Sequence, residues 1–157
     1  MSGMPVKRAL IAFLLVLCLS TPAFASRYCF EAAGAEYGVS PQLLWSIAKT
    51  ESGFAPRAVR WDPNGTYDYG VMQINSSWAP KLGLASWRRL GDPCANIKAG
   101  AWILAGCVRR YGYTWKAVGC YNASSKSKRE EYARKVYVVF KRYFRGTSPP
   151  RTSPGRP

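Results

Sequence analysis

The sequence predicts an α+β fold in which helices dominate, and three observations support this fold class. Helix start and stop signals flank apolar segments through most of the region from residue 26 to residue 145. One Asn-Gly pair, Asn64-Gly65, interrupts the helical pattern and predicts a small antiparallel hairpin. No internal repeat is present, so we expect one domain with one core.

The first two helices are defined by their terminal residues. The segment from Tyr28 to Tyr37 predicts a short helix that ends at Gly38. Ser40 then suits the N-cap of a second helix, and Pro41 suits its first helical position. We expect this second helix to stop at Gly53.

The hairpin follows the second helix, and further helices fill the rest of the domain. Asn64-Gly65 predicts a type I′ turn with a short strand on either side. The later helices are expected around Trp78–Leu82, Pro93–Tyr111, Trp115–Asn122 and from about Lys128 to Phe144.

Residues 1–25 have the pattern of a secretory signal peptide. Lys7 and Arg8 precede an apolar run from Ala9 to Leu19, and Ala23-Phe24-Ala25 has the form of a signal-peptidase site. A transmembrane anchor is the alternative, but the apolar run is shorter than the roughly 20 residues that span a bilayer. We therefore expect export to the periplasm, cleavage after Ala25 and no stable membrane insertion.

Four cysteines remain after the predicted signal: Cys29, Cys94, Cys107 and Cys120. An even number in an exported domain indicates two disulfides, and the residues alone leave three connectivities open. The chain contains no histidine, which excludes Ser-His-Asp and Cys-His mechanisms and a His-ligated zinc site. No CxxC spacing occurs either, so we expect neither a metal nor a cofactor.

The chain is strongly basic, with a formal net charge of +15. Lys7 and Arg8 leave with the predicted signal, so the exported part carries +13. Such a charge attracts nucleic acid, anionic lipid or anionic cell-wall polymer. Export and the lack of a nucleic-acid-binding motif favour the wall or a membrane over nucleic acid, so we expect no nucleic-acid partner. The last residues, 146–157, are rich in Pro, Ser and Arg and predict a disordered tail.

Glu51 is an acid on the apolar face of the second helix. The apolar stripe runs through Leu44, Ile47 and Ala48, and the helical period continues it to Glu51. Burial and the negative end of the helix dipole would both raise the pKa of this carboxyl, as a general acid near neutral pH requires. The alternative is that Glu51 turns into water where the helix ends.

Asp68 lies on the second strand of the predicted hairpin, where a charged residue is most often simply solvated. The alternation from Asp62 to Asp68 also suggests a calcium loop, but the EF-hand pattern fails because Tyr67 and Gln73 stand where Gly and Glu are needed. Together with Glu51, Asp68 has the composition of a glycosidase pair, in which one carboxyl donates a proton and the other stabilises developing positive charge. Lysozyme divides the two roles between two carboxyls in this way.

Several segments resemble the motifs of the soluble lytic transglycosylases. These are "ESGF" at 51–54, "DYGVMQIN" at 68–75 and "AVGCYNAS" at 117–124. They are most similar to the small members associated with type III secretion systems, as is "DPCANIKAGAWIL" at 92–104. The resemblance implies a lysozyme-like fold, with a helical lobe and a hairpin flanking a cleft.

The resemblance also implies a substrate and residue roles. The substrate would be the glycan strand of peptidoglycan, cleaved at the MurNAc-β-1,4-GlcNAc bond with formation of a 1,6-anhydro ring. Glu51 would be the catalytic acid and base. Substrate binding would fall to Ser52, Met72, Gln73, Asn75, Tyr121 and Asn122.

Three further expectations come from the resemblance. The hairpin is similar to that of c-type lysozymes, which implies a catalytic supporting role for Asp68 and leaves hydrolysis open as the outcome. Relatives with two cysteines keep those that correspond to Cys29 and Cys94, which implies the pairs Cys29–Cys94 and Cys107–Cys120. The protein would act as a monomer that opens the wall for a secretion apparatus. A hydrolysing muramidase and a non-catalytic wall-binding module are the alternatives.

Overall fold

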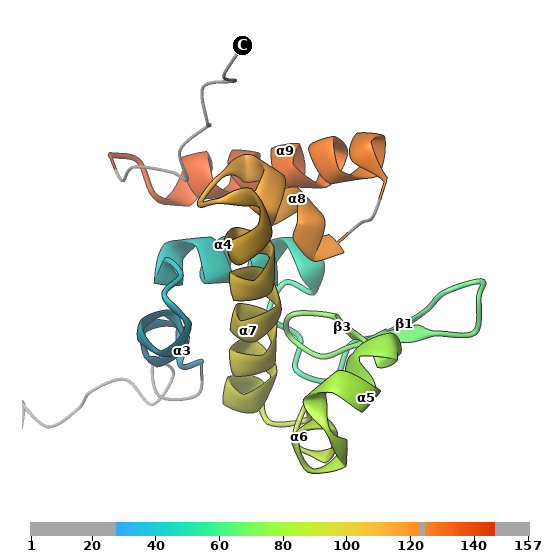
Figure 1. The fold of residues 1–157 in the computed structure, drawn as a ribbon. Coiled ribbons are helices and arrows are strands. Elements are labelled where there is room, and N and C mark those ends of the chain that lie inside the picture. The colour runs from blue at the N-terminus through green and yellow to red at the C-terminus, as the bar shows by residue number, and fades with distance from the viewer. Residues whose placement is uncertain (1–27, 123–124, 147–157) are drawn as a thin grey trace, which may run out of the picture.

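The computed structural model describes residues 28–122 and 125–146 and confirms the α+β class (Figure 1). The predicted signal peptide and residues 147–157 of the predicted tail lie outside the described residues. The helices are α3 (Phe30–Tyr37), α4 (Pro41–Glu51), α5 (Ala79–Leu82), α6 (Leu84–Arg88), α7 (Pro93–Tyr111), α8 (Trp115–Asn122) and α9 (Lys126–Tyr143). The strands are β1 (Val59–Trp61), β2 (Tyr67–Tyr69) and β3 (Ile74–Asn75), and β3 leads into the 3-10 turn η1 (Ser76–Trp78).

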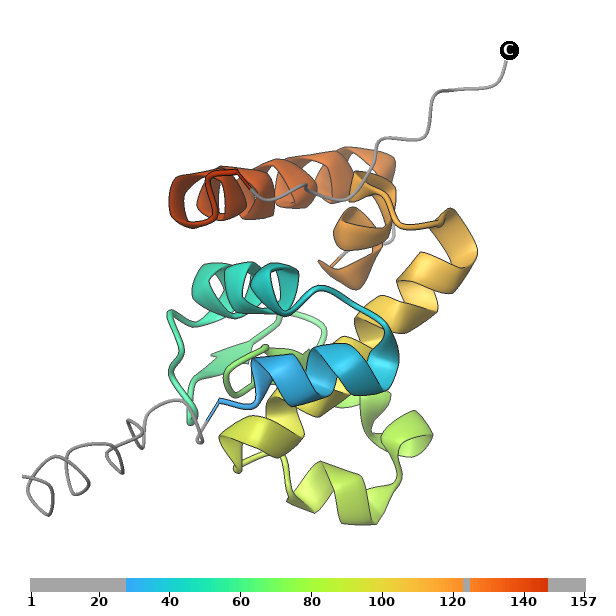
Figure 2. The ribbon, with the colours of Figure 1, turned by 90° about the vertical axis from the view of Figure 1, so that its left-hand side faces the viewer.

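The helix α4 lies at the centre of the helical lobe. It packs against α3, α7 and α9, and Figure 2 shows α9 lying along it on one side. Ser40 caps its N-terminus by accepting a hydrogen bond from the Leu43 N–H (3.2 Å), with Pro41 as the first helical residue. Both signals are confirmed, and Gly53 follows the helix in the left-handed conformation with φ 60°. Four apolar side chains of α4 are almost completely buried because helices surround them: Leu43, Leu44, Ile47 and Ala48.

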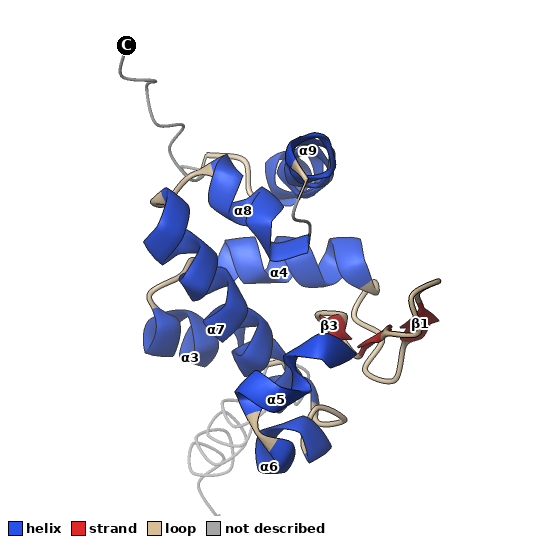
Figure 3. Ribbon diagram, turned by 45° about the vertical axis from the view of Figure 1, so that its right-hand side comes forward, coloured by secondary structure: helices blue, strands red, loops and turns tan. Residues whose placement is uncertain are grey.

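The strands gather on one side of the molecule, apart from the helical lobe (Figure 3). They form an antiparallel sheet in the order β1-β2-β3. The predicted hairpin is present as β1 and β2, but the third strand, β3, was not predicted. It is only two residues long and has no alternating pattern of its own, so only pairing with β2 defines it.

The predicted type I′ turn at Asn64-Gly65 is wrong. Such a turn needs a positive φ at both residues, and among the described residues other than glycine only Phe54 and Gln73 have one. The Gly65 N–H instead donates to the Asp62 carbonyl (3.1 Å), and Gly65 follows in the left-handed conformation with φ 83°. The connection is therefore a three-residue loop that ends in a glycine bulge, a form that Pro63 favours at the first central position of the turn.

Other boundaries differ by a few residues. The short helix α6 was not predicted, because Gly83 separates it from α5 and five residues show no clear period. The last helix begins at Lys126, slightly before the predicted start at Lys128.

Two disulfides join distant parts of the helical lobe, Cys29–Cys94 and Cys107–Cys120, which confirms the pairing that the resemblance implies. The first closes a separation of 65 residues and the second one of 13. Chain-entropy arguments give about 4 and about 3 kcal/mol of stabilisation, respectively. Within the described ranges, no helix is long and apolar enough to cross a membrane.

The side chain of Asn96 on α7 connects the helical lobe to the sheet. It is completely buried, and its Oδ1 accepts a hydrogen bond from the Met72 N–H (2.8 Å). Its Nδ2 donates to the carbonyls of Tyr69 (3.0 Å) and Leu90 (3.1 Å). One side chain thus binds three backbone groups, two at the turn after β2 and one at Leu90.

We expect Gly119→Ala to destabilise the fold by about 2 kcal/mol. A Cβ at this position in α8 would lie 2.5 Å from the Arg129 carbonyl oxygen, a backbone atom of α9 that cannot rotate away. Urea unfolding measures the loss. Gly106→Ala on α7 is the matched control, because its Cβ would meet only the flexible end of Arg109 at 3.6 Å. The control should be as stable as the wild type or slightly more stable, and equal losses in both variants would contradict the packing argument.

Candidate active site

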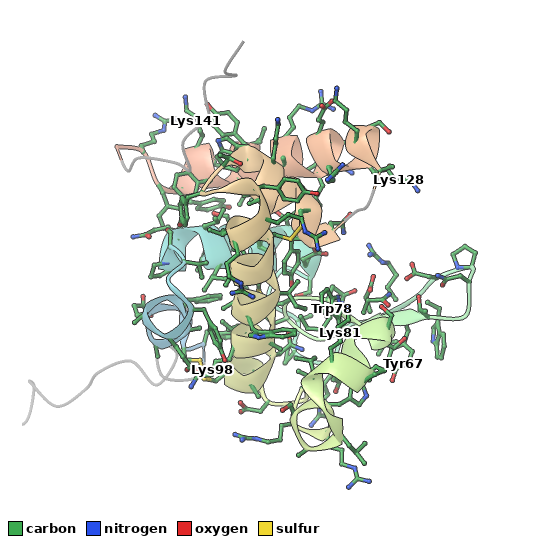
Figure 4. The ribbon with its side chains drawn as sticks, in the orientation of Figure 1. Tyr67, Trp78, Lys81, Lys98, Lys128 and Lys141 are labelled. Atoms are coloured by element: carbon green, nitrogen blue, oxygen red, sulfur yellow. A yellow bond between two sulfur atoms is a disulfide. The ribbon has the colours of Figure 1, made fainter. Side chains whose placement is uncertain are left out.

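A cleft of about 1200 Å³ lies between the helical lobe and the sheet. Both predicted carboxylates line it, Glu51 from the end of α4 and Asp68 from β2. Four of the six predicted substrate-binding residues also line it, namely Gln73, Asn75, Tyr121 and Asn122. Trp78 and Lys81 contribute from the sheet side, with the Lys81 ammonium 4.8 Å from the indole ring centre (Figure 4).

The carboxyl of Glu51 is mostly buried where α4 ends. The Tyr132 hydroxyl of α9 donates a hydrogen bond to its Oε1 (2.6 Å). Burial raises the pKa of Glu51 from 4.5 to about 7, and the negative charge of Asp68 adds to this rise. The Tyr132 hydrogen bond, the Arg60 charge and an Asn122 hydrogen bond act in the opposite direction, but burial outweighs them. Glu51 is therefore a carboxyl that can donate a proton near neutral pH.

Asp68 lies on the central strand of the sheet and is 6% exposed. Its two nearest cross-strand neighbours are Arg60 on β1 and Asn75 on β3. Arg60 forms an ion pair with Oδ2 (2.5 Å), and the Asn75 amide donates to Oδ1 (2.9 Å). Both oxygens of Asp68 are thus held by side chains of neighbouring strands, one of them a cation, whereas burial dominates the environment of Glu51.

Gln73 and Asn75 are held in place by hydrogen bonds around the sheet. Gln73 has a φ of 47°, and its amide donates to the carbonyls of Gly70 (3.0 Å) and Ala58 (3.2 Å). The Asn75 amide also donates to Asp62 and Thr66, both at 3.1 Å. These bonds fix the wall of the cleft around Asp68.

The structure places Met72 and Ser52 away from the cleft. Met72 is completely buried, and a Cβ added at Gly100 of α7 would lie 2.7 Å from its methyl group. Its side chain therefore belongs to the core, which corrects the expectation that it lines the sugar site. The Ser52 hydroxyl donates to the Val71 carbonyl (2.8 Å) and accepts from the Ala55 N–H (3.0 Å), so it ties α4 to the segment after β2.

Tyr121 reaches the sheet as well as the cleft. Its hydroxyl donates to the Met72 carbonyl (2.8 Å), and its ring stacks on that of Tyr132 with centres 6.4 Å apart. Tyr121, from the motif at 117–124, therefore contacts Tyr132, which bonds Glu51, and the segment that carries Gln73.

Sequence reasoning missed Arg60 and Tyr132. A two-residue turn at Asn64-Gly65 would place Trp61 opposite Asp68, whereas the three-residue loop places Arg60 there. Tyr132 stands in the apolar row of α9 with Val136 and Phe140, a spacing that predicts a core position. Only the packing of α9 on α4 brings its hydroxyl to Glu51.

The model of the transglycosylase SLT domain family matches residues 28–138. The chain belongs to the SLT transglycosylase family. The matched part of this SLT protein contains both carboxylates and all the predicted substrate-binding residues.

Curated relatives resemble this SLT protein over most of their length. Invasion protein IagB of Salmonella typhimurium (strain SL1344) is 34% identical over 137 residues, which cover 83% of this chain and 86% of the relative. Protein IpgF of Shigella flexneri is 34% identical, covering 85% and 90%. A peptidoglycan-binding-like protein of Escherichia coli O157:H7 is 36% identical over 152 residues, covering 88% and 91%.

The raised pKa of Glu51 predicts a pH dependence of stability. Between pH 4.5 and about 7 the folded SLT domain keeps a proton that the unfolded chain releases. The free energy of unfolding therefore falls as the pH rises through this window, and the loss is complete above it. Glu51→Gln cannot ionise, so we expect its free energy of unfolding to exceed that of the wild type by about 3 kcal/mol at pH 8 and to match it at pH 4.

Urea unfolding of the SLT domain at a series of pH values measures this difference. Glu130→Gln is the control, because Glu130 is exposed on α9 outside the cleft. Its curve should run parallel to that of the wild type. A parallel curve for Glu51→Gln as well would show that Glu51 is not desolvated.

We expect Tyr132→Phe to raise the pKa of Glu51 further, because it removes a hydrogen bond that stabilises the carboxylate. Tyr121→Phe is the matched control in the SLT domain, since the hydroxyl of the stacked ring bonds Met72 instead. Carbon-13 NMR of the Glu51 carboxyl reports the titration directly. The same upward shift in both variants would mean that general loosening, and not the Tyr132 hydrogen bond, controls the pKa.

Proposed function

We propose that this protein is a peptidoglycan lytic transglycosylase that cleaves the MurNAc-β-1,4-GlcNAc bond and leaves a 1,6-anhydroMurNAc end. The observation that carries the proposal is the Glu51 carboxyl, which is desolvated in the cleft and has a pKa of about 7. Membership of the SLT family supports peptidoglycan as the substrate.

The reaction needs one group that acts first as acid and then as base. The protonated Glu51 donates its proton to the glycosidic oxygen, and the bond between that oxygen and the muramic acid C1 breaks. The C6 hydroxyl oxygen of the same sugar then bonds to C1, and its proton passes to the Glu51 carboxylate. The carboxyl is restored and no water is consumed. A pKa near 7 suits both steps, because neither protonation state is strongly disfavoured.

Asp68 supports the positive charge that develops at C1 during bond cleavage. Its negative charge also raises the pKa of Glu51, so the two carboxyls act on each other across the cleft. Gln73, Asn75, Tyr121 and Asn122 would contact the saccharide, and Ser52 would hold the end of α4 beside them.

Hydrolysis by a muramidase is the second candidate, and the position of Asp68 favours it. A second carboxylate beside the reacting carbon is the arrangement in which water completes glycoside cleavage. A non-catalytic wall-binding module accounts less well for the site, because binding a glycan strand does not require a desolvated acid that lowers stability above neutral pH.

The cellular setting follows from the sequence and the relatives. Two disulfides and a domain that acts on the cell wall indicate an exported protein. We propose that residues 1–25 direct export to the periplasm, where the protein acts as a monomer without a cofactor. The likeness to an invasion protein supports a role in opening the wall locally for a secretion apparatus.

Digestion of purified sacculi, followed by mass spectrometry of the released muropeptides, tests the proposal. We expect anhydro-muramic ends; reducing ends would identify a hydrolase instead. Glu51→Gln should lower the rate at least a hundredfold, since it removes the proton donor. Asp68→Asn should lower it roughly tenfold to a hundredfold.

If folded protein releases no soluble product, both the transglycosylase and the muramidase proposals are contradicted. A near-wild-type rate for Asp68→Asn would mean that Asp68 stabilises the sheet and takes no part in the reaction. Thermal unfolding of each variant checks that the loss is not a loss of fold.

A further inference from the structure

Four cations line the part of the cleft where α7 ends and α9 begins: Arg109, Arg110, Lys128 and Arg129. Figure 4 shows Lys128 at this end of α9. In the described ranges none of the four forms an ion pair with a carboxylate. The acids that line the cleft lie elsewhere, on α4, on β2 and in the hairpin loop. The cleft therefore has a cationic end, defined by these four residues, and an end at the sheet where two acids, Asp62 and Asp68, are offset by two cations, Arg60 and Lys81.

The cationic end is partly fixed before any ligand arrives. Arg129 donates a hydrogen bond to the Tyr111 hydroxyl (2.7 Å), and its guanidinium carbon lies 5.4 Å from the centre of the Tyr111 ring. Burial acts to raise the pKa of Tyr111, but hydrogen bonds and charge from Arg129 and Arg110 lower it, which reports a positive potential at this place. A positioned guanidinium loses less conformational entropy on binding than a free one.

Helix stability accounts for only two of the four charges. Arg109 and Arg110 lie in the last turn of α7, where cations complement the helix dipole. Lys128 and Arg129 lie near the start of α9, where the dipole disfavours cations. The first turn of α9 contains no acid, and the side chain of Ser125 makes no capping hydrogen bond. The charges near the start of α9 therefore oppose its dipole, and helix stability does not account for them.

We propose that the cationic end binds the free carboxylates of the peptide that muramic acid carries, and so makes the protein selective for peptide-substituted glycan over bare glycan. The inference rests on the proposed function. The bond to be cleaved is next to muramic acid, so this sugar must lie beside Glu51, and its peptide must leave the cleft from there. The cationic end attracts an anionic peptide, whereas at the sheet the charges of Arg60 and Lys81 offset those of Asp62 and Asp68.

A comparison of two double variants on two substrates tests the selectivity. Arg110→Gln with Lys128→Gln removes two exposed cations from the cationic end. Lys116→Gln with Lys141→Gln removes two exposed cations that do not line the cleft, and Lys141 lies at the other end of α9 (Figure 4). The control therefore has the same net charge. The substrates are glycan strands with their peptides and the same strands after an amidase has removed them.

We expect the cationic-end variant to lose about fivefold in kcat/KM on peptide-bearing strands and to cleave bare strands as the wild type does. The control should match the wild type on both. Converting the peptide carboxylates to amides should slow the wild type by a similar factor, which separates recognition of the carboxylates from recognition of the peptide chain. Binding is measured in parallel with turnover. It uses the same strands and the Glu51→Gln variant, with and without the two cationic-end substitutions.

Equal losses on both substrates, equal losses in both double variants, or no loss at all would overturn the inference. If the wild type cleaves neither substrate but the cationic-end substitutions weaken binding of peptide-bearing strands and not of bare strands, the proposed function fails and the carboxylate site stands. If the wild type cleaves the glycan but the cationic-end substitutions affect both kinds of strand equally, the carboxylate site fails and the proposed function stands.

Discussion

The three hydrogen bonds of the buried Asn96 side chain hold the sheet against the helical lobe, and the shape of the cleft depends on them. The amide reaches backbone groups before and after the turn that follows β2, at Tyr69 and Met72, and one at Leu90. Gly70 is required beside it, because a Cβ there would overlap the Asn96 amide. A buried polar group that is fully satisfied is rigid, since any movement would leave a desolvated donor or acceptor.

The segment after β2 therefore acts as a structural bridge as well as a wall of the cleft. The Met72 N–H is bound by Asn96 and its carbonyl by the Tyr121 hydroxyl, while its side chain packs on Gly100. Met72 thus contributes by anchoring its neighbours. Gln73, the next residue, is held in a left-handed conformation and faces the cleft from this anchored position.

The chemistry of the site follows from two carboxyls in different surroundings. Helices bury Glu51, and the resulting desolvation outweighs the Tyr132 hydrogen bond and the Arg60 charge that favour ionisation. Strands surround Asp68 with an arginine and an amide that satisfy both of its oxygens. Arg60 links the two carboxyls, because it pairs with one and lowers the pKa of the other. The proposed division into a proton donor and a charge stabiliser rests on this contrast.

The sequence by itself determined the features that depend on neighbouring residues. The Ser40-Pro41 start and the Gly53 stop of α4, and the place of Glu51 on its apolar face, follow from local capping and the helical period. Tertiary structure decided what depends on distant partners. The loop that ends at Gly65 sets the register that pairs Arg60 with Asp68, and one residue of slip would have paired Trp61 instead. Tyr132 meets Glu51 across 81 residues, because α9 packs on α4, and no local pattern carries that information.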